Sequence, residues 1–328
     1  MRVSKTTLAP VGAAPAPAVV AVDVGGSSVR AAVSRAPGEI GDVQSRPLAH
    51  LRGSPSAVDA VVALSVDAVA AARIAGAAPR AVGLAIPGIV DPAAGVGVSS
   101  MILGWHQVPF AALVAAATGL PVALGHDVRL AARAEGCWGA GAGHRDWLFV
   151  TLGTGVGAAF VLGGEVYTGA HGLGGELAHV VVEPGGPLCR CGKRGCLEMV
   201  SSADAVTHGY TASAGADVAD ASEVVTLAAA GDLLARTVWN RAIAGLARAL
   251  TSYTEMLDPE AIIVGGGMSA AGDALFSPLG RALREGVSFA VAPTLRPAGL
   301  GAMAGVHGAA LAAREVLFTT GAKAGSSA

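Results

Sequence analysis

The sequence predicts an α/β protein with two domains. Its 328 residues suffice for two hydrophobic cores. Strand-like runs alternate with helix-like segments on both sides of glycine-rich turns, which is typical of mixed α/β layers. The segment FVTLGTGVGAAFVL also repeats the pattern and the glycine placement of AVDVGGSSVRAAV, which lies earlier in the chain. This repetition indicates a duplicated α/β core in which each half begins with a glycine turn.

The first half of the chain opens with a predicted hairpin. Residues 18–24 are rich in valine, and residues 29–33 resume the strand pattern after the turn Gly25, Gly26, Ser27 and Ser28. The other elements of this half follow from apolar spacing and turn signals: a helix over 59–74, a strand over 81–86 that ends at Pro87-Gly88, a helix over 107–117, and a strand over 121–124 that leads into Gly125.

The second half begins with a helix and a second hairpin. Its predicted elements are a helix over 128–138, the strand–turn–strand unit from Trp147, an amphipathic helix over 235–257 that Asp258-Pro259 ends, a strand over 261–264, and a final helix over 303–316. We expect the domain break near Gly125, with domains at 18–125 and 126–318. The last helix is free in this scheme to return to the first domain.

The two ends of the chain have compositions typical of segments without a core. Residues 1–17 contain an Ala/Pro run and predict a flexible arm, and residues 319–328 predict a disordered tail. The first segment lacks the continuous apolar stretch of a signal peptide, and the apolar segment 57–78 contains Asp67 and Arg73. We therefore expect a soluble cytoplasmic protein that does not enter a membrane.

Charge and core composition narrow the classes of partner. Lys and Arg number 22 and Asp and Glu number 24, so a net charge of −2 gives no overall attraction to nucleic acid. Hydrophobic residues make up 52% of the chain and aromatic residues only 4%, so the core must be built from Ala, Val and Leu. The 47 glycines indicate tight turns and close backbone approaches, as phosphate-binding folds require.

Three cysteines and a histidine have the spacing of a metal site. Cys189, Cys191 and Cys196 form C-x-C-x4-C, and His179 precedes them. Zn²⁺ prefers thiolate and imidazole in a tetrahedral arrangement, so these four residues complete a structural zinc site. The alternative is a group of free thiols in a glycine-rich loop. Cys137, far from the group, is expected to be a buried small residue.

Glycine turns that follow strands point to phosphate binding. Phosphate oxygens need several backbone N–H donors directed at one place, and glycine lets the chain curl closely enough to supply them. No G-K-[ST] motif occurs, so none of these turns is a P-loop. The candidate residues are Gly25, Gly26, Ser27, Ser28, Gly153, Thr154, Gly155, Gly157, Gly265, Gly266 and Gly267.

Two motifs in order resemble the signature of the ROK family, which contains sugar kinases and sugar-responsive repressors. They are G-x2-G-x2-G-E-x2-H, ending at His179, and C-x-C-G-x2-G-C-x-E, ending at Glu198. The glycine turns resemble those of the actin-like ATPase superfamily, to which ROK kinases belong. The resemblance implies a two-domain actin-like (ribonuclease H-like) fold with a cleft between the domains and the zinc loop in the second. It also implies a homodimer.

The resemblance assigns roles to individual residues. Asp127, which follows a buried strand and precedes a helix, would be the general base that accepts the proton of a sugar hydroxyl. Asp23 would position Mg²⁺ through water, and ATP would be the phosphoryl donor. The residues expected to bind the sugar are Gly88, His126, Asp127, Glu176, His179 and Glu198. We therefore expect ATP-dependent phosphorylation of a glucose-type hexose at the 6-hydroxyl.

The sequence departs from the family pattern at the sugar site. The pattern N-D-x-N reads His126, Asp127, Val128, Arg129 here, Ile102 replaces an asparagine ahead of Leu-Gly-Trp, and Ala178 replaces a glycine. These changes leave three alternatives open: a kinase for an N-acylated hexosamine, a kinase that uses polyphosphate, and a non-catalytic sugar sensor. Family repressors carry an N-terminal helix-turn-helix, for which residues 1–17 leave no room, so DNA binding is not expected.

Overall fold

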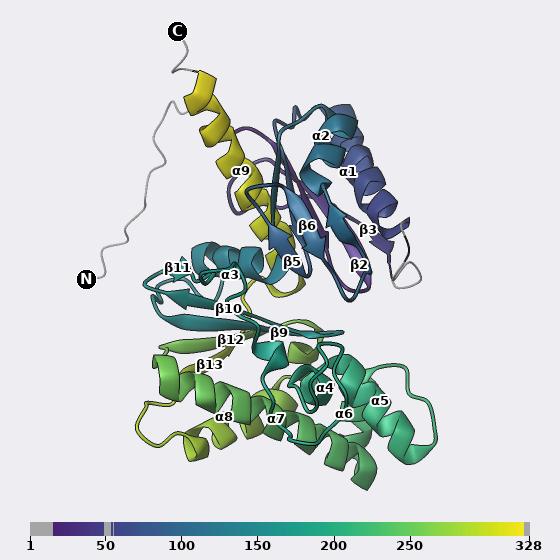
Figure 1. Cartoon of the computed structure of the whole chain (residues 1–328), viewed down its shortest axis with the longest axis vertical. Coiled ribbons are helices and arrows are strands. Elements are labelled where there is room, and N and C mark those ends of the chain that lie inside the picture. The colour runs from purple at the N-terminus through teal and green to yellow at the C-terminus, as the bar shows by residue number, and fades with distance from the viewer. Residues whose placement is uncertain (1–15, 49–53, 55, 325–328) are drawn as a thin grey trace, which may run out of the picture.

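The computed structural model describes residues 16–48, 54 and 56–324, and it arranges them in two bodies, each built on one five-stranded sheet (Figure 1). The strand orders are β3-β2-β1-β4-β8 and β11-β10-β9-β12-β13. In each sheet the first three strands along the chain pair antiparallel and the remaining two add in parallel. The two sheets thus share one topology, as the repeated hairpin pattern predicts.

The first sheet has its centre at two fully buried strands. Its strands are β1 (Val19–Val24), β2 (Ser28–Ser34), β3 (Val43–Pro47), β4 (Val82–Ile86) and β8 (Val122–His126). Helices α1 (Ser56–Ile74) and α2 (Phe110–Thr118) cover one face, and α9 (Ala304–Ala324) covers the other. Because helices cover both faces, β1 and β4 contain apolar residues on both sides rather than in alternation.

A small antiparallel sheet lies beside this first sheet. It consists of β5 (Ile89–Asp91), β6 (Val96–Ser99) and β7 (His106–Val108). The sequence prediction of a helix over 107–117 is wrong at its start, because Val108 pairs with Gly97 in the sheet and the helix begins only at Phe110. Pro109 supplies no backbone N–H and stands at the N-cap position, where none is needed.

The second sheet places alternate residues of β9 on opposite faces. Its strands are β9 (Trp147–Leu152), β10 (Val156–Leu162), β11 (Glu165–Val166), β12 (Ala261–Gly265) and β13 (Thr294–Pro297). Leu148, Val150 and Leu152 pack in a cluster with α7 (Leu233–Leu257) and α8 (Asp273–Gly286). Trp147 and Phe149 pack in another cluster with α3 (Asp127–Trp138). This alternation follows the two-residue period of a strand.

The remaining helices lie in the connections between these elements along the chain. They are η2 (Leu177–His179), α4 (Glu198–Ser201), α5 (Ala203–Ala214), α6 (Ala221–Ala230), η3 (Gly267–Ala271) and η4 (Gly301–Met303).

The buried carboxylate of Glu135 on α3 holds the chain segment that leads into η4 and α9. It accepts hydrogen bonds from the backbone N–H groups of Ala140 (2.7 Å), Gly299 (2.9 Å) and Leu300 (2.8 Å).

The last helix packs on the first sheet and contacts α3. A Cβ atom at Gly308 would lie 2.2 Å from the carbonyl oxygen of Leu130, so α9 and α3 approach as closely as their backbones allow. The helix extends to Ala324, beyond the start of the tail expected over 319–328, because its hydrogen-bonded turns continue from the packed segment. Residues 325–328 and residues 1–15 of the expected arm lie outside the described residues.

Two further expectations concern exposure. Cys137, expected to be buried, is exposed, because it lies near the C-terminal end of α3 on the side away from the sheet cores. Among the residues that the structure describes, no helix combines the length and apolarity that a membrane span requires.

Candidate active site

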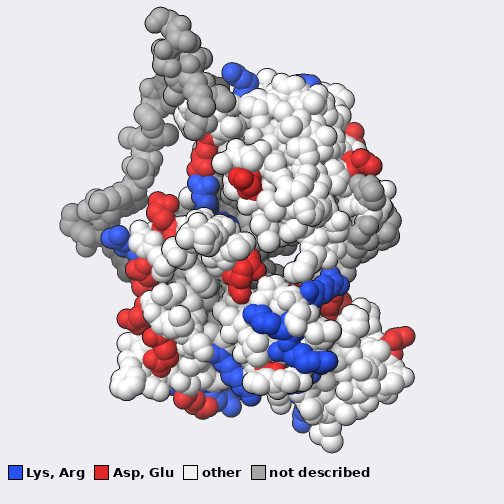
Figure 2. Space-filling view, viewed as in Figure 1, with Lys and Arg blue, Asp and Glu red and all other residues white. Residues whose placement is uncertain are grey.

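A cleft of about 1170 Å³ separates the two bodies, and both contribute residues to its walls. The space-filling view shows it as a hollow between the upper and lower parts of the molecule, with charged side chains at its edges (Figure 2). Most of the residues that the sequence assigned to a site line this cleft: Asp23, Gly25, Gly26, Ser27, Gly88, His126, Asp127, Gly153, Thr154, Gly155, Gly157, Glu176, His179, Cys191, Glu198, Gly266 and Gly267.

The two hairpin turns face each other across the cleft. In the first turn Gly25 N–H donates to the Ser28 carbonyl at 2.8 Å, and in the second Gly153 N–H donates to the Gly155 carbonyl at 3.0 Å. A Cβ atom at Gly26 would lie 3.7 Å from the Cβ atom of Thr154. The two turns therefore approach each other closely, and their backbone groups can bind one ligand from both sides.

The third glycine turn, Gly265 to Gly267, packs against the backbone at the end of β9. Gly266 has a φ of 80° and leaves no room for a side chain, since a Cβ atom there would lie 2.4 Å from the carbonyl oxygen of Leu152. Two residues assigned to these turns do not line the cleft. Ser28 already belongs to β2, and Gly265 is buried in β12, where Phe149 limits the space beside it.

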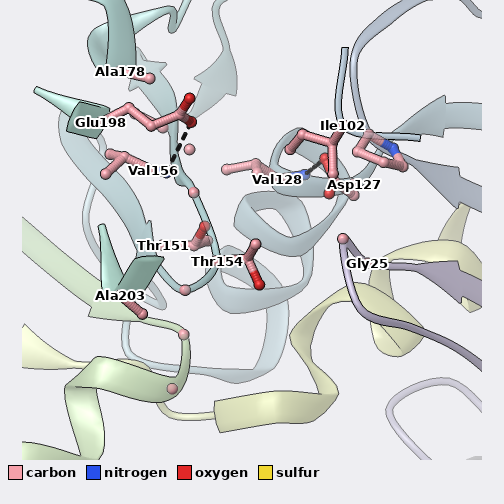
Figure 3. Close-up of a pocket in the computed structure, with 18 of the residues that line it drawn as sticks. Gly25, Ile102, Asp127, Val128, Thr151, Thr154, Val156, Ala178, Glu198 and Ala203 are labelled. Carbon is pink, nitrogen blue, oxygen red and sulfur yellow. Dashed lines mark hydrogen bonds between the residues drawn. The ribbon is translucent and has the colours of Figure 1, made fainter. Parts of the chain in front are cut away.

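Asp127 is the first residue of α3 and lies in the cleft between the two bodies (Figure 3). Its Oδ1 accepts a hydrogen bond from the Val128 N–H at 2.8 Å, which fixes the side chain at the helix N-terminus. Burial raises the pKa of Asp127 to about 6, with a further contribution from the negative charge of Glu176. A carboxylate with a raised pKa is suited to accept a proton near neutral pH.

His126 lies beside this carboxylate as a neutral imidazole. Its Nδ1 is 3.3 Å from Asp127 Oδ1, and burial lowers the pKa of His126 to about 4, with the positive charge of Arg129 acting in the same direction. An uncharged imidazole can both donate to and accept from a hydroxyl group. The residue that replaces the family asparagine therefore keeps both hydrogen-bonding capacities.

Asp23 lies at the end of β1 against the last helix. Arg30 Nη2 contacts its Oδ2 at 2.8 Å, and the side chain is almost fully buried. Burial raises the pKa of Asp23 to about 6, and the charge of Asp127 contributes to this shift. The buried carboxylate of Asp23 and the partly buried carboxylate of Asp127 face one cleft and fit a divalent cation, because its charge would offset their desolvation and mutual repulsion.

Glu176, His179 and Glu198 form the wall of the cleft opposite Asp127. His179 Nε2 lies 4.0 Å from Glu176 Oε2, while its Nδ1 lies 3.6 Å from Cys189 Sγ. The two ring nitrogens thus face different groups. Glu198 accepts a hydrogen bond from the Val156 N–H at 3.3 Å, which ties this wall to the second glycine turn (Figure 3).

The cysteine group has the geometry of a zinc site. One ligand atom from each of His179, Cys189, Cys191 and Cys196 lies within 4.8 Å of the others. Burial raises the pKa of the Cys196 thiol to about 12, so a thiolate at this position requires a cation beside it. A tight turn, in which Cys189 N–H donates to the Lys193 carbonyl at 2.7 Å, brings Cys189 and Cys191 together. The donor set and its compactness fit Zn²⁺.

The cleft also contains residues that the sequence did not reveal. At the end near α6 these include Ala203, Asp220, Ser222, Thr226 and Met268. Asp220 caps α6, and Glu223 accepts a hydrogen bond from the Ala219 N–H at 2.7 Å, so the pattern Asp-x-x-Glu was a signal for this helix start. Nothing in that signal indicates that the helix start faces the cleft.

Comparisons with known proteins agree on one family. A model of the ROK family matches residues 19–316. A glucokinase of Thermotoga maritima is 41% identical over 212 residues, which are 60% of this chain and 67% of the relative. An N-acetylmannosamine kinase of Shigella flexneri is 31% identical over 257 residues, which are 77% of this chain and 84% of the relative. The crystal structure of a ROK family glucokinase from Streptomyces griseus in complex with glucose and AMPPNP has a TM-score of 0.79 and 28% identity, and the match covers 91% of this chain and 99% of that one.

Proposed function

The chain belongs to the ROK family as a sugar kinase, and we propose that it transfers the γ-phosphate of ATP to the 6-hydroxyl of a glucose-type hexose. Its two sheets of one topology, with a cleft between them, form the actin-like fold of this family. The observation that carries the proposal is the place of Asp127. It lies in the cleft together with the glycine turns of both bodies and the wall formed by Glu176, His179 and Glu198.

The geometry supports a division of the cleft into two parts. The glycine turns offer backbone N–H groups to the phosphates of ATP, and Glu176, His179 and Glu198 offer acceptors to sugar hydroxyls. Asp127 would take the proton of the attacking hydroxyl at its carboxylate, which its raised pKa permits near neutral pH. The ATP analogue and glucose named for the Streptomyces griseus structure support this choice of substrates.

Two metal ions would contribute to the reaction or to the shape of the site, each held by its own residues. Asp23 would hold Mg²⁺ through water, and the bound Mg²⁺ would neutralise part of the phosphate charge. His179, Cys189, Cys191 and Cys196 would hold Zn²⁺. Zinc at His179 Nδ1 would fix the imidazole, so that Nε2 remains directed at the cleft.

We also propose that the chain divides near Gly125, where β8 completes the first sheet. In this division the cleft closes by a movement of the two bodies, which would exclude water from the transferred phosphate. Arg190 in the cysteine loop already donates a hydrogen bond to the Met101 carbonyl at 3.2 Å across the cleft. This bond joins the two walls of the cleft.

An N-acylated hexosamine is a second candidate substrate, and Ile102 favours it. Its side chain lies next to Asp127 in the cleft, at a position where the family resemblance implies asparagine (Figure 3). Isoleucine offers no hydrogen bond to a sugar hydroxyl, but it suits the methyl group of an acetamide. The similarity to an N-acetylmannosamine kinase supports the same substrate class.

A coupled assay of ADP release tests both candidates. It uses Mg²⁺ and ATP with glucose, mannose, N-acetylmannosamine, N-acetylglucosamine, fructose and allose. A parallel series with polyphosphate in place of ATP measures the sugar phosphate directly, because polyphosphate yields no ADP. We expect release with glucose, or with an N-acylated hexosamine if Ile102 sets the preference, and loss of that release in Asp127→Asn. In the second case Ile102→Asn should move the preference towards glucose. Absence of sugar phosphate with every sugar and both donors contradicts the proposed function.

A further inference from the structure

Arg129 connects the helix that carries Asp127 to the loop that carries Glu176. It lies in the first turn of α3, and its Nη2 donates to the Gly172 carbonyl at 2.7 Å and to the Gly174 carbonyl at 2.9 Å. The guanidinium is half-buried at the wall of the cleft. One nitrogen of Arg129 therefore holds two carbonyl groups of a segment far away in the sequence.

The loop depends on external contacts for its position. Glycines at 169, 172 and 175 have positive φ values of 75°, 70° and 97°, a conformation that glycine adopts without strain. Within the loop, Gly174 N–H donates to the Thr168 carbonyl at 2.8 Å. The hydrogen bonds that join the loop to α3 both come from Arg129. Because glycines lose much conformational entropy on ordering, such a loop needs an anchor to hold the residue that follows it.

The residue that follows the loop is Glu176. A Cβ atom at Gly175 would lie 2.5 Å from the Ala158 carbonyl oxygen, so the backbone before Glu176 lies directly on β10. Burial lowers the pKa of the Arg129 guanidinium, and the negative charges of Glu176 and Asp127, which lie near it, oppose this shift in part. Arg129 thus supplies a positive charge near both carboxylates.

We propose that Arg129 is a positioning residue for sugar binding, which anchors the loop 169–175 through the Gly172 and Gly174 carbonyls and so places Glu176 opposite Asp127. This role rests on the proposed function, in which Glu176 contacts the sugar. Arginine suits it because a planar guanidinium keeps its charge and donates in fixed directions. The residue that departs from the family pattern at this position would then contribute to this chain's own sugar site.

The experiment compares Arg129→Met and Arg129→Lys with the matched control Arg133→Met, one turn further along α3. Arg133 forms an exposed ion pair with Glu315 and lies outside the cleft. Each variant is tested for its thermal melting, for the KM of the preferred sugar and of ATP, and for amide hydrogen exchange over 168–177. The exchange measurement requires no activity, so it tests the anchor even if the chain phosphorylates none of the sugars in the screen.

We expect Arg129→Met to exchange faster over 168–177 and to raise the sugar KM by about ten- to hundredfold, the effect of losing hydrogen bonds from a charged donor, while the KM of ATP changes little. Arg129→Lys, which retains the charge but not the planar fork, should restore part of the sugar affinity, and Arg133→Met should match the unmodified protein. A normal sugar KM in Arg129→Met, or unchanged exchange over the loop, overturns the proposal. If Arg129→Met does not fold, the same two outcomes apply to Arg129→Lys.

Discussion

A Cβ atom at Gly305 would lie 2.4 Å from Asp23 Oδ1, so the last helix gives Asp23 its place in the cleft by carrying no side chain at that point. On the other side, Arg30 Nη2 contacts Asp23 Oδ2 at 2.8 Å. The carboxylate is thus confined between a helix backbone and a guanidinium.

Gly305→Ala is therefore expected to impair the use of Mg²⁺ and ATP without unfolding the protein. The added methyl group would displace the Asp23 carboxylate, and we expect kcat/KM for ATP to fall by about ten- to hundredfold, as for loss of one well-placed charged contact. Steady-state kinetics over a range of Mg²⁺ concentrations measures this effect. Gly280→Ala in α8, where the nearest heavy atom would be 3.4 Å from the new Cβ, is the control and should leave the kinetics unchanged.

The raised pKa of Asp127 predicts opposite effects of pH on activity and on stability. A general base must be ionised, so kcat/KM should fall by about tenfold per pH unit below pH 6. The folded-state pKa lies above the ordinary value of 3.8, so the folded protein binds the proton more tightly than the unfolded chain does. This carboxyl group therefore lowers the free energy of unfolding as pH rises from about 4 to 6, and Asp23 acts in the same direction.

Asp127→Asn separates these two effects. We expect a loss of about 10²- to 10⁴-fold in kcat, the usual contribution of a general base, and a free energy of unfolding at pH 7 that is equal to or higher than that of the unmodified protein. Asparagine can still accept from the Val128 N–H, so the start of α3 should be retained. Full activity in this variant would mean that another group accepts the proton.

Removal of the metal is expected to affect both folding and sugar binding. Elemental analysis should find about one zinc per chain, because the four ligands of one tetrahedral ion lie together. Cys196→Ser should lose the metal, lower Tm and raise the sugar KM, since His179 then loses the ion that orients its ring. Cys137→Ser, an exposed cysteine outside the group, should retain metal and affinity. A metal-free protein with unchanged Tm and sugar KM contradicts the zinc assignment.

Glu135→Ala should be among the most destabilising single changes in α3. It leaves the partly buried hydrogen bonds of the Ala140, Gly299 and Leu300 N–H groups without their acceptor, and each loss from a charged partner costs about 1.5–3 kcal/mol. We expect a decrease of about 3–5 kcal/mol in the free energy of unfolding, allowing for non-additivity. Glu315→Ala, which breaks only an exposed ion pair, should cost no more than about 1 kcal/mol. Urea titration compares the two.

The parts of the fold with strong local signals could be predicted from the sequence. The hairpins were identifiable because valine-rich runs end at paired glycines, and the cysteine group because its ligands lie close together in the chain. The start of α2 was missed, since an apolar spacing that suits a helix continues through residues that pair as β7. The small sheet β5–β7 was missed because its strands are too short for a two-residue period to be visible.

The contacts that organise the cleft could not be predicted in the same way. Arg30 reaches Asp23 from the next strand, Arg129 reaches Gly172, and Gly305 makes room for Asp23 from the far end of the chain. No local pattern records such pairs, because each depends on how distant elements approach in three dimensions. For the same reason Ser28 and Gly265 were predicted to belong to the phosphate-binding turns. In the structure both residues pair with neighbouring strands and do not line the cleft.

The position of α9 sets an order for events on the ribosome. Val19, Ala21 and Ala85 of the first sheet are buried beneath Val306 and Ala309, which are translated much later than the sheet. The sheet that is made first therefore keeps much of one apolar face uncovered until α9 has been synthesised, and such exposed apolar surface favours aggregation of a nascent chain. In this protein the half that is translated last completes the half that is translated first.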